Sequence, residues 1–224
     1  MNLFQMRDVV EDIISNSDYD PTRINAFINE GVQAVATGVI LPGRFDLSPP
    51  LPDLYTTDTV DTDANSFVSL PADFNRDVVI VKDSNSNKIP IISSFQNFLH
   101  LYKEETGSVD KCSINGSILH YRGIPSSPET LTVNYYSTPA TLIADDDIPT
   151  DIPLVLHRQL IVGYALKEIY NEIELGMEGR KVDMKNYEEI FNQGLVRLRQ
   201  LIPEDSLPDF YEENQNDINR NQRI

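Results

Sequence analysis

Residues 1–38 carry apolar positions with helical spacing, in two separate stretches. The first stripe consists of Met6, Val9, Val10, Ile13 and Ile14, and the second of Ile24, Phe27, Ile28, Gly31, Val32 and Val35. Between them Asp20 stands where an N-cap belongs, and Pro21 follows at the first helical position, where a missing N–H costs nothing. The pattern predicts two short helices, each with one face that must be buried against a partner.

Residues 40–65 have a different character. Four prolines lie between residues 42 and 52, and a run rich in Thr and Asp follows at 56–63. Such a stretch does not sustain a long helix. We predict a linker or a surface arm here, with a short strand near Val60.

Residues 66–140 alternate between short apolar runs and turn-forming residues, which favours β-structure. Asn115-Gly116 is the typical sequence of a type I′ hairpin turn, and Ser94 is expected to cap a helix that runs through about Glu105. The expected strands are 66–70, 77–81, 88–92, 112–114, 117–121 and 130–136. Short strands in this number predict a small antiparallel sheet or sandwich.

The last third returns to helical periodicity. Asp151 is expected to cap a helix that Pro153 enters and that runs to about Leu175. A second helix is expected from about Asp183 to Leu201, because Pro203 ends it. The tail beyond it is polar and has little means of forming its own core.

The order of elements is therefore helices, then strands, then helices. Helices at both ends of the chain pack together only if the β-region is an insertion that returns the chain to its origin. We predict an α+β fold with a helical bundle formed by residues 1–39 and 141–202. An arm and a small antiparallel β-domain are inserted at 40–140, and residues 203–224 form an extended C-terminal tail.

The composition excludes several classes of protein. The chain has 18 Lys+Arg against 35 Asp+Glu, a formal net charge of -17, so it lacks the basic excess of proteins that grip nucleic acid. Residues 153–202 are neutral by count, and the acidic excess lies in the remaining segments. A single Cys112 excludes an internal disulfide framework. No signal peptide or membrane span is evident, so we expect an acidic, soluble protein of a reducing compartment.

Candidate chemistry is sparse. Asp145–Asp147 with Asp151 offer oxygen ligands for a hard cation, but the calcium-loop spacing is absent. A solvated loop favoured by the positive N-terminus of the following helix is the better interpretation. His157 is better explained as a partly buried or interface histidine than as a catalytic base. No phosphate-cradling glycine motif occurs, so we expect no enzyme, cofactor or metal site.

Several segments, in their order along the chain, resemble a known family. They read "INAFINEGVQAV", "SFVSLPADFNRDVVIV", "KIPI", "GSILHYRGIPSSPETLTVNYYSTPATL" and "DIPLVLHRQLIVGYALKEIY". This succession resembles the head-to-tail adaptor (connector, or head-completion) proteins of tailed bacteriophages, in particular the larger type with a β-insertion in a helical bundle. The resemblance covers about residues 1–202 and rests on segment order and phrases such as "SLPADF".

The resemblance implies a non-enzymatic structural protein of the virion, without a cofactor. Such adaptors form a ring, commonly of twelve copies, beneath the portal protein at the neck between head and tail. They contact neighbouring adaptor subunits, extend the DNA channel and present a surface to the next tail or nozzle protein. The resemblance thus implies that DNA passes through without specific binding, that no membrane is involved and that the protein is made in the host cytoplasm.

The candidate partner contacts lie in the helix at 153–175 and in the tail. In several adaptors the C-terminal segment docks on the portal, and an aromatic pair in a polar tail suits an anchor that orders on a partner. The alternative is a disordered terminus. The partner-binding candidates are Phe210, Tyr211, Arg220, Arg223, His157 and Arg158.

Two alternatives stay open at this point. The acidic side chains either line a channel and keep DNA mobile, or face solvent and keep the protein soluble. The competing function is a non-catalytic binding module of a virion or host protein that recognises carbohydrate or protein through its β-domain. That function needs exposed aromatic residues on the sheet. Tyr135 and Tyr136 are the suggestive pair, although strand alternation places one of them inside.

Overall fold

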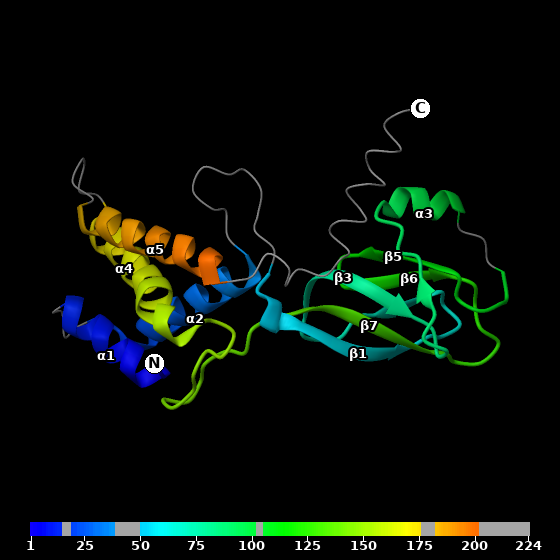
Figure 1. Cartoon of the computed structure of the whole chain (residues 1–224), viewed down its shortest axis with the longest axis horizontal. Coiled ribbons are helices and arrows are strands. Elements are labelled where there is room, and N and C mark those ends of the chain that lie inside the picture. Colours follow the sequence, from blue (N-terminus) through cyan, green and yellow to red (C-terminus); the bar gives the residue numbers. More distant parts are fainter. Residues whose placement is uncertain (15–18, 39–49, 102–104, 176–181, 202–224) are drawn as a thin grey trace. The chain divides into compact units, whose positions relative to one another are not determined.

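The computed structural model describes residues 1–14, 19–38, 50–101, 105–175 and 182–201. These residues form two compact units (Figure 1). The helical unit comprises the described residues of 1–54 and 139–201, and the β unit comprises those of 55–138. The predicted α+β fold, with helices at both ends of the chain and antiparallel strands between them, is confirmed. The predicted C-terminal tail lies outside the described residues.

The helical unit brings the two ends of the chain together. Helices α1 (Leu3–Ile14) and α2 (Pro21–Thr37) pack with α4 (Gly163–Ile173), and α5 (Val182–Leu201) packs along α4. A short 3₁₀ turn, η1 (Pro52–Leu54), also belongs to this unit. The core consists mainly of aliphatic side chains, among them Leu3, Met6, Val10, Ile24, Ile28, Val32, Leu160, Leu166, Ile169, Leu195 and Leu198.

Local capping fixes where the first two helices begin. The Asn2 side chain accepts the backbone N–H of Gln5 at 2.9 Å, and the Gln5 side chain accepts that of Asn2 at 3.1 Å. This reciprocal pair is a capping box for α1. The Asp20 carboxylate accepts the N–H of Thr22 at 2.9 Å, with Pro21 at the first helical position, as the sequence predicts.

The prediction of one continuous α-helix at 153–175 is wrong, because the segment changes its type of helix twice. The chain forms a 3₁₀ turn, η2 (Leu154–Leu156), then a π-helical turn, η3 (Arg158–Val162), and only then α4. Pro153, not Asp151, occupies the position before η2, and no side chain caps it. All three windings bury one apolar face, so the periodicity of the sequence does not distinguish them.

The π-helical turn packs closely on α5 at a glycine. A Cβ placed on Gly194 would lie 2.8 Å from Leu160 Cδ2 and 3.1 Å from Gln159 Cβ. Real Cβ atoms do not approach other heavy atoms at 2.8 Å. A side chain at Gly194 would force the Leu160 and Gln159 side chains to move, so the glycine permits the close approach of η3 and α5.

The β unit is a sandwich of two small antiparallel sheets. One has the order β1 (Tyr55–Asp61), β7 (Thr130–Ser137), β3 (Phe74–Lys82), β4 (Lys88–Ile89), and the other the order β2 (Phe67–Ser69), β6 (Ile118–Arg122), β5 (Lys111–Asn115). Helix α3 (Phe95–Leu101) follows β4 and begins after Ser94, as predicted. One buried cluster contains residues of both sheets, among them Val60, Val81, Cys112, Leu119, Tyr121, Leu131, Val133 and Tyr135.

Strand β1 confirms the strand predicted near Val60, but it is longer than expected. All seven residues of 55–61 pair with β7, from Tyr55 opposite Tyr136 to Asp61 opposite Thr130, so this part of the predicted linker or arm belongs to the sheet. Its threonines are β-branched and suit a strand, although Thr and Asp also occur in loops. Pairing with a segment more than sixty residues away decides the outcome. Residues 39–49 of the predicted arm lie outside the described residues.

The β5–β6 hairpin is confirmed, but its turn is shifted by one residue. Asn115 pairs with Ile118, so the two loop residues are Gly116 and Ser117. Gly116 has a φ of 62°, and Asn115 and Ser117 are not among the residues with positive φ. A positive φ at the first loop residue alone fits a type II′ turn, not the expected type I′.

We predict that Gly194→Val destabilises the protein by about 2 kcal/mol, because overpacking at a close contact typically costs about 1–3 kcal/mol. Urea unfolding followed by circular dichroism measures the change. Gly107→Val is the matched control, since a Cβ at Gly107 meets nothing within 4 Å. Equal midpoints for the two variants would show that η3 and α5 do not depend on the glycine.

Candidate interaction surface

The loop at 141–151 is fastened to the first turn of α1. The backbone N–H of Leu3 donates to the Asp147 carbonyl at 2.9 Å, and that of Phe4 to the Asp145 carbonyl at 3.0 Å. The first N–H groups of a helix have no partner within the helix, so the loop satisfies two of them. Arg7 adds an ion pair with Asp145 at 2.9 Å.

The acidic run thus serves a different helix from the one predicted. It lies at the N-terminus of α1, not at that of the following helix. The Asp147 carboxylate accepts the N–H groups of Ile143 and Ala144 at 2.7 and 2.8 Å, and these bonds lower the pKa of Asp147. Among the described residues, no group of three or more acidic, His or Cys side chains is placed to hold a metal ion.

His157 joins the same helix start to η2 from inside the protein. Its side chain is only 1% exposed, and Nε2 lies 2.8 Å from the Ile152 carbonyl oxygen. Nδ1 lies 3.0 Å from the Met1 nitrogen. An ammonium group only donates, so Nδ1 accepts and the neutral ring donates from Nε2. Burial lowers the pKa of His157, which favours this neutral form.

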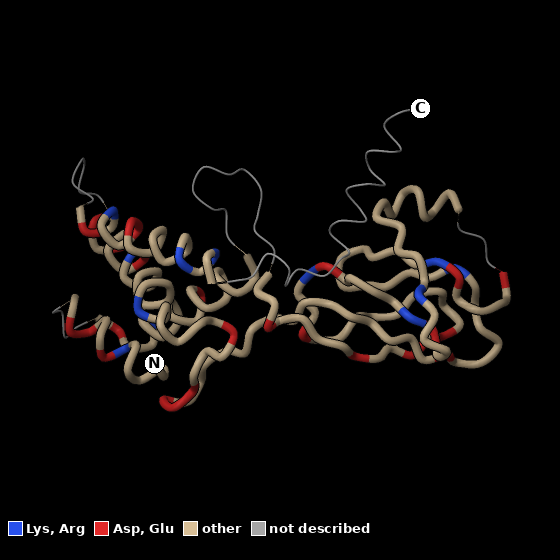
Figure 2. Tube along the Cα trace, in the orientation of Figure 1, with Lys and Arg blue, Asp and Glu red and all other residues tan. Residues whose placement is uncertain are grey.

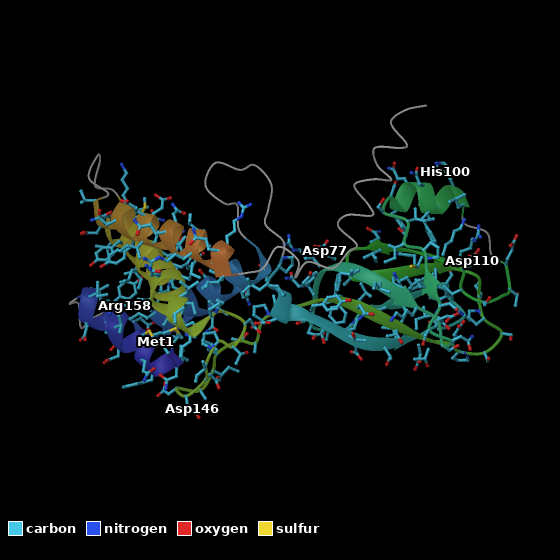
Figure 3. The ribbon with its side chains drawn as sticks, in the orientation of Figure 1. Met1, Asp77, His100, Asp110, Asp146 and Arg158 are labelled. Carbon is cyan, nitrogen blue, oxygen red and sulfur yellow. The ribbon has the colours of Figure 1, made fainter. Side chains whose placement is uncertain are left out.

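The predicted partner-binding residues separate into three groups. The ring of His157 is used within the protein, whereas Arg158, at the start of η3, is exposed (Figure 3). Contact of either residue with a partner stays a prediction. The remaining candidates lie outside the described residues: Phe210, Tyr211, Arg220 and Arg223.

Large apolar side chains project from the segment around this helix start. The exposed fractions are 84% for Ile143, 77% for Val155, 66% for Leu154, 51% for Ile148 and 50% for Phe4. We name these five residues the junction surface. Exposed apolar side chains mark a protein-contact site where they form one patch, so these five residues are a candidate contact site.

The junction surface has acidic surroundings. Figure 2 shows acidic residues in the adjoining loop and along α1, and Figure 3 shows Asp146 at the edge of the helical unit. Asp146 is exposed, and so is Asp8, which follows Phe4 by one helical turn. The arrangement suits a partner that offers both apolar and basic groups.

Sequence reasoning missed the junction surface, although one signal was present. Leu154, Val155 and Leu156 are consecutive apolar residues, and a helix buries only some of three such neighbours. Here Leu156 is buried, while Leu154 and Val155 are exposed. Nothing in the pattern around Ile143 and Ile148 distinguishes them from loop residues that fold back into a core.

The aromatic pair on the sheet is not available to a ligand. Tyr135 and Tyr136 are each 1% exposed. Alternation places Tyr135 in the sandwich core, where its hydroxyl donates to Asp73 at 2.6 Å. Tyr136 lies on the other face, with Tyr55 packed edge-on at 5.6 Å between ring centroids. The prediction that one of the pair lies inside is confirmed, and the other is buried as well.

The β unit also has an open depression between its loops. Small polar residues, prolines and Glu129 line it: Ser84, Thr106, Gly107, Ser108, Pro125, Ser126, Ser127, Pro128, Glu129 and Thr130. No aromatic ring occurs among the described residues of this lining, so they offer no stacking surface of the kind that a carbohydrate-binding module was expected to present.

We predict that His157 makes stability depend on pH. Its pKa is lowered below the reference value of 6.5, so its contribution is present above about pH 6.5 and is lost as the pH falls. When the pH falls from about 7.5 to about 5, the free energy of unfolding should decrease less for His157→Gln than for the wild type. The difference between the two decreases should be about 1.4 kcal/mol for each unit by which folding lowers the pKa of His157.

Thermal unfolding at the two pH values measures this difference. His100→Gln is the control, because His100 is exposed on α3. Several carboxylates also contribute to acid sensitivity, and they are common to all three proteins. The same pH dependence in the His157→Gln variant and in the wild type would refute the role assigned to His157.

Comparison with known proteins agrees with this architecture. The sequence model of one family, described as SU10 adaptor protein, matches residues 1–208 and so includes both units. No curated protein matches the chain. In the parts of the chain that the structure describes, none of the helices has the length and apolar character needed to cross a membrane. The resemblance to phage head-to-tail adaptors is confirmed: the chain belongs to the SU10 adaptor protein family, and it is a structural adaptor of a phage.

Proposed function

We propose that the protein assembles as a ring, of about twelve copies, beneath the portal at the capsid vertex. There it extends the DNA channel and provides the attachment surface for the tail. Its partners are the portal protein, neighbouring adaptor subunits and the next tail or nozzle protein. The family match over residues 1–208 carries this proposal, and the exposed junction surface supports it.

We assign different contacts to the different parts of the chain. Residues 1–39 and 141–202 act as the bundle that meets neighbouring copies and the portal. Residues 40–140 act as the inserted domain that faces outward or towards the tail, and residues 203–224 act as an extension that docks on the portal. The exposed apolar side chains of the junction surface support a contact role for the bundle.

DNA passes this protein without being held by it. Each phosphate that a basic side chain neutralises adds affinity and slows movement along the channel. The net charge of -17 makes such neutralisation weak on average. Acidic residues appear in both units (Figure 2), so a lumen lined by either unit would repel the duplex.

The assembly test uses the full chain and the purified portal ring of the same phage. We predict that the two co-sediment and that electron microscopy shows one additional ring on the portal. The chain on its own is the reference, because an adaptor that assembles only on the portal stays small without it. A chain that leaves the portal ring bare at micromolar concentrations would refute the proposal.

The tail gives a separate prediction. Phe210 and Tyr211 are aromatic residues in a polar segment, which suits a portal anchor. Phe210→Ala with Tyr211→Ala should weaken portal binding at least tenfold, as should deletion of residues 205–224. Asn214→Ala with Gln215→Ala is the matched control in the same tail. Unchanged binding after the deletion would remove the tail from the portal contact.

A further inference from the structure

We infer that neighbouring copies meet head to tail, with the junction surface of one copy against the C-terminal half of α5 of the next. The inference rests on the proposed ring and names the two faces that would form it. Three observations on the helical unit support it: exposed apolar residues on both faces, exposed charges of opposite sign beside them, and the separation of the two faces on the unit.

The second face lies on the C-terminal half of α5. Gly194, Leu195 and Leu198 are buried against the bundle, and the opposite side of the helix is exposed. We name as the α5 face the residues Val196, Arg197, Arg199 and Leu201, all of them exposed. Val196 is 51% and Leu201 53% exposed. The face therefore has apolar side chains beside two arginines.

The charges of the two faces are complementary. Residues 190–201 contain two arginines and no acidic residue. Arg197 is held by the Gln159 side chain at 3.1 Å, which leaves its positive charge without a counter-ion in that contact. The junction surface has Asp146 and Asp8 beside it, both exposed. Apolar patches bordered by opposite charges suit each other as docking partners.

The two faces lie on different sides of the same unit. In Figure 1, α5 runs along one edge of the helical unit, and α1 and the loop at 141–151 lie at the other. Figure 3 places Asp146 at that second edge. One copy therefore does not satisfy its own faces, and the contact must pass from copy to copy.

The charged residues of the two faces argue against a two-fold contact. A symmetric contact uses the same patch on both copies. Because the two faces lie on different sides of the unit (Figure 1), such a contact would place the side that carries Asp146 against the same side of the next copy, or the arginines of α5 against each other, and like charges at an interface are unfavourable. A head-to-tail contact pairs unlike faces, and repetition of one closes a ring when the rotation allows it.

Charge reversal on each face tests the inference. One variant has Asp8→Lys and Asp146→Lys, and the other has Arg197→Glu and Arg199→Glu. Each alone should lower assembly on the portal ring at least tenfold. An equimolar mixture should assemble, because every contact between unlike variants is again of opposite charge. The chain that carries all four changes should assemble for the same reason.

Matched controls are available on the β unit. Asp58→Lys and Lys88→Glu reverse exposed charges on the other unit and should assemble as the wild type does. Wild-type assembly should weaken as salt rises, since exposed charge pairs are screened. Circular dichroism confirms that each variant is folded before assembly is measured.

The outcomes separate this contact from the proposed function. If the wild type forms rings and each reversal variant forms them equally well, the contact is overturned and the proposed ring is not. Loss of portal binding by the Asp8/Asp146 variant, without rescue by the Arg197/Arg199 variant, would assign the junction surface to the portal and also overturn the contact. A wild-type chain that forms no ring would overturn both.

Discussion

The structure of the helical unit depends on how the chain returns to its beginning after the strands. Carbonyl groups of Asp145 and Asp147 accept the first free N–H groups of α1, and the buried His157 ring bonds Met1 and Ile152. Apart from the bond between His157 and Ile152, these contacts join residues separated by most of the sequence. They reinforce the packing of α1 and α2 with α4, and this packing matters because a short amphipathic helix gains its stability from the partner that covers its apolar face.

The same closure explains why the junction surface is exposed. The loop at 141–151 uses its backbone and carboxylates to cap α1 and its own turn, which fixes its course along the surface. Its apolar side chains at Ile143 and Ile148 then have no core within reach. At η2, Leu156 enters the core, and Leu154 and Val155 project outward. A protein that functions alone would gain nothing from this exposure, whereas an adaptor gains a surface for its partners.

What the sequence predicts correctly is mostly local. The stripe of α2 and its Asp20 cap are encoded within one segment, and the structure agrees with both. The errors arise where distant segments decide. Strand β1 requires β7, the winding of η3 accompanies its close approach to Gly194, and the burial of Tyr136 involves Tyr55. The internal role of His157 depends on Met1, which no spacing rule relates to it.

The proposed contact also changes how the net charge should be interpreted. If Arg197 and Arg199 of one copy lie against Asp146 of the next, most of the basic side chains of α5 are paired within the interface. Equal numbers of cations and carboxylates are withdrawn from the surface, so the net charge that each copy leaves exposed on the assembled ring stays as acidic as that of the free chain. Assembly would thus leave the repulsion of DNA undiminished, because the acidic excess belongs to carboxylates outside the contact.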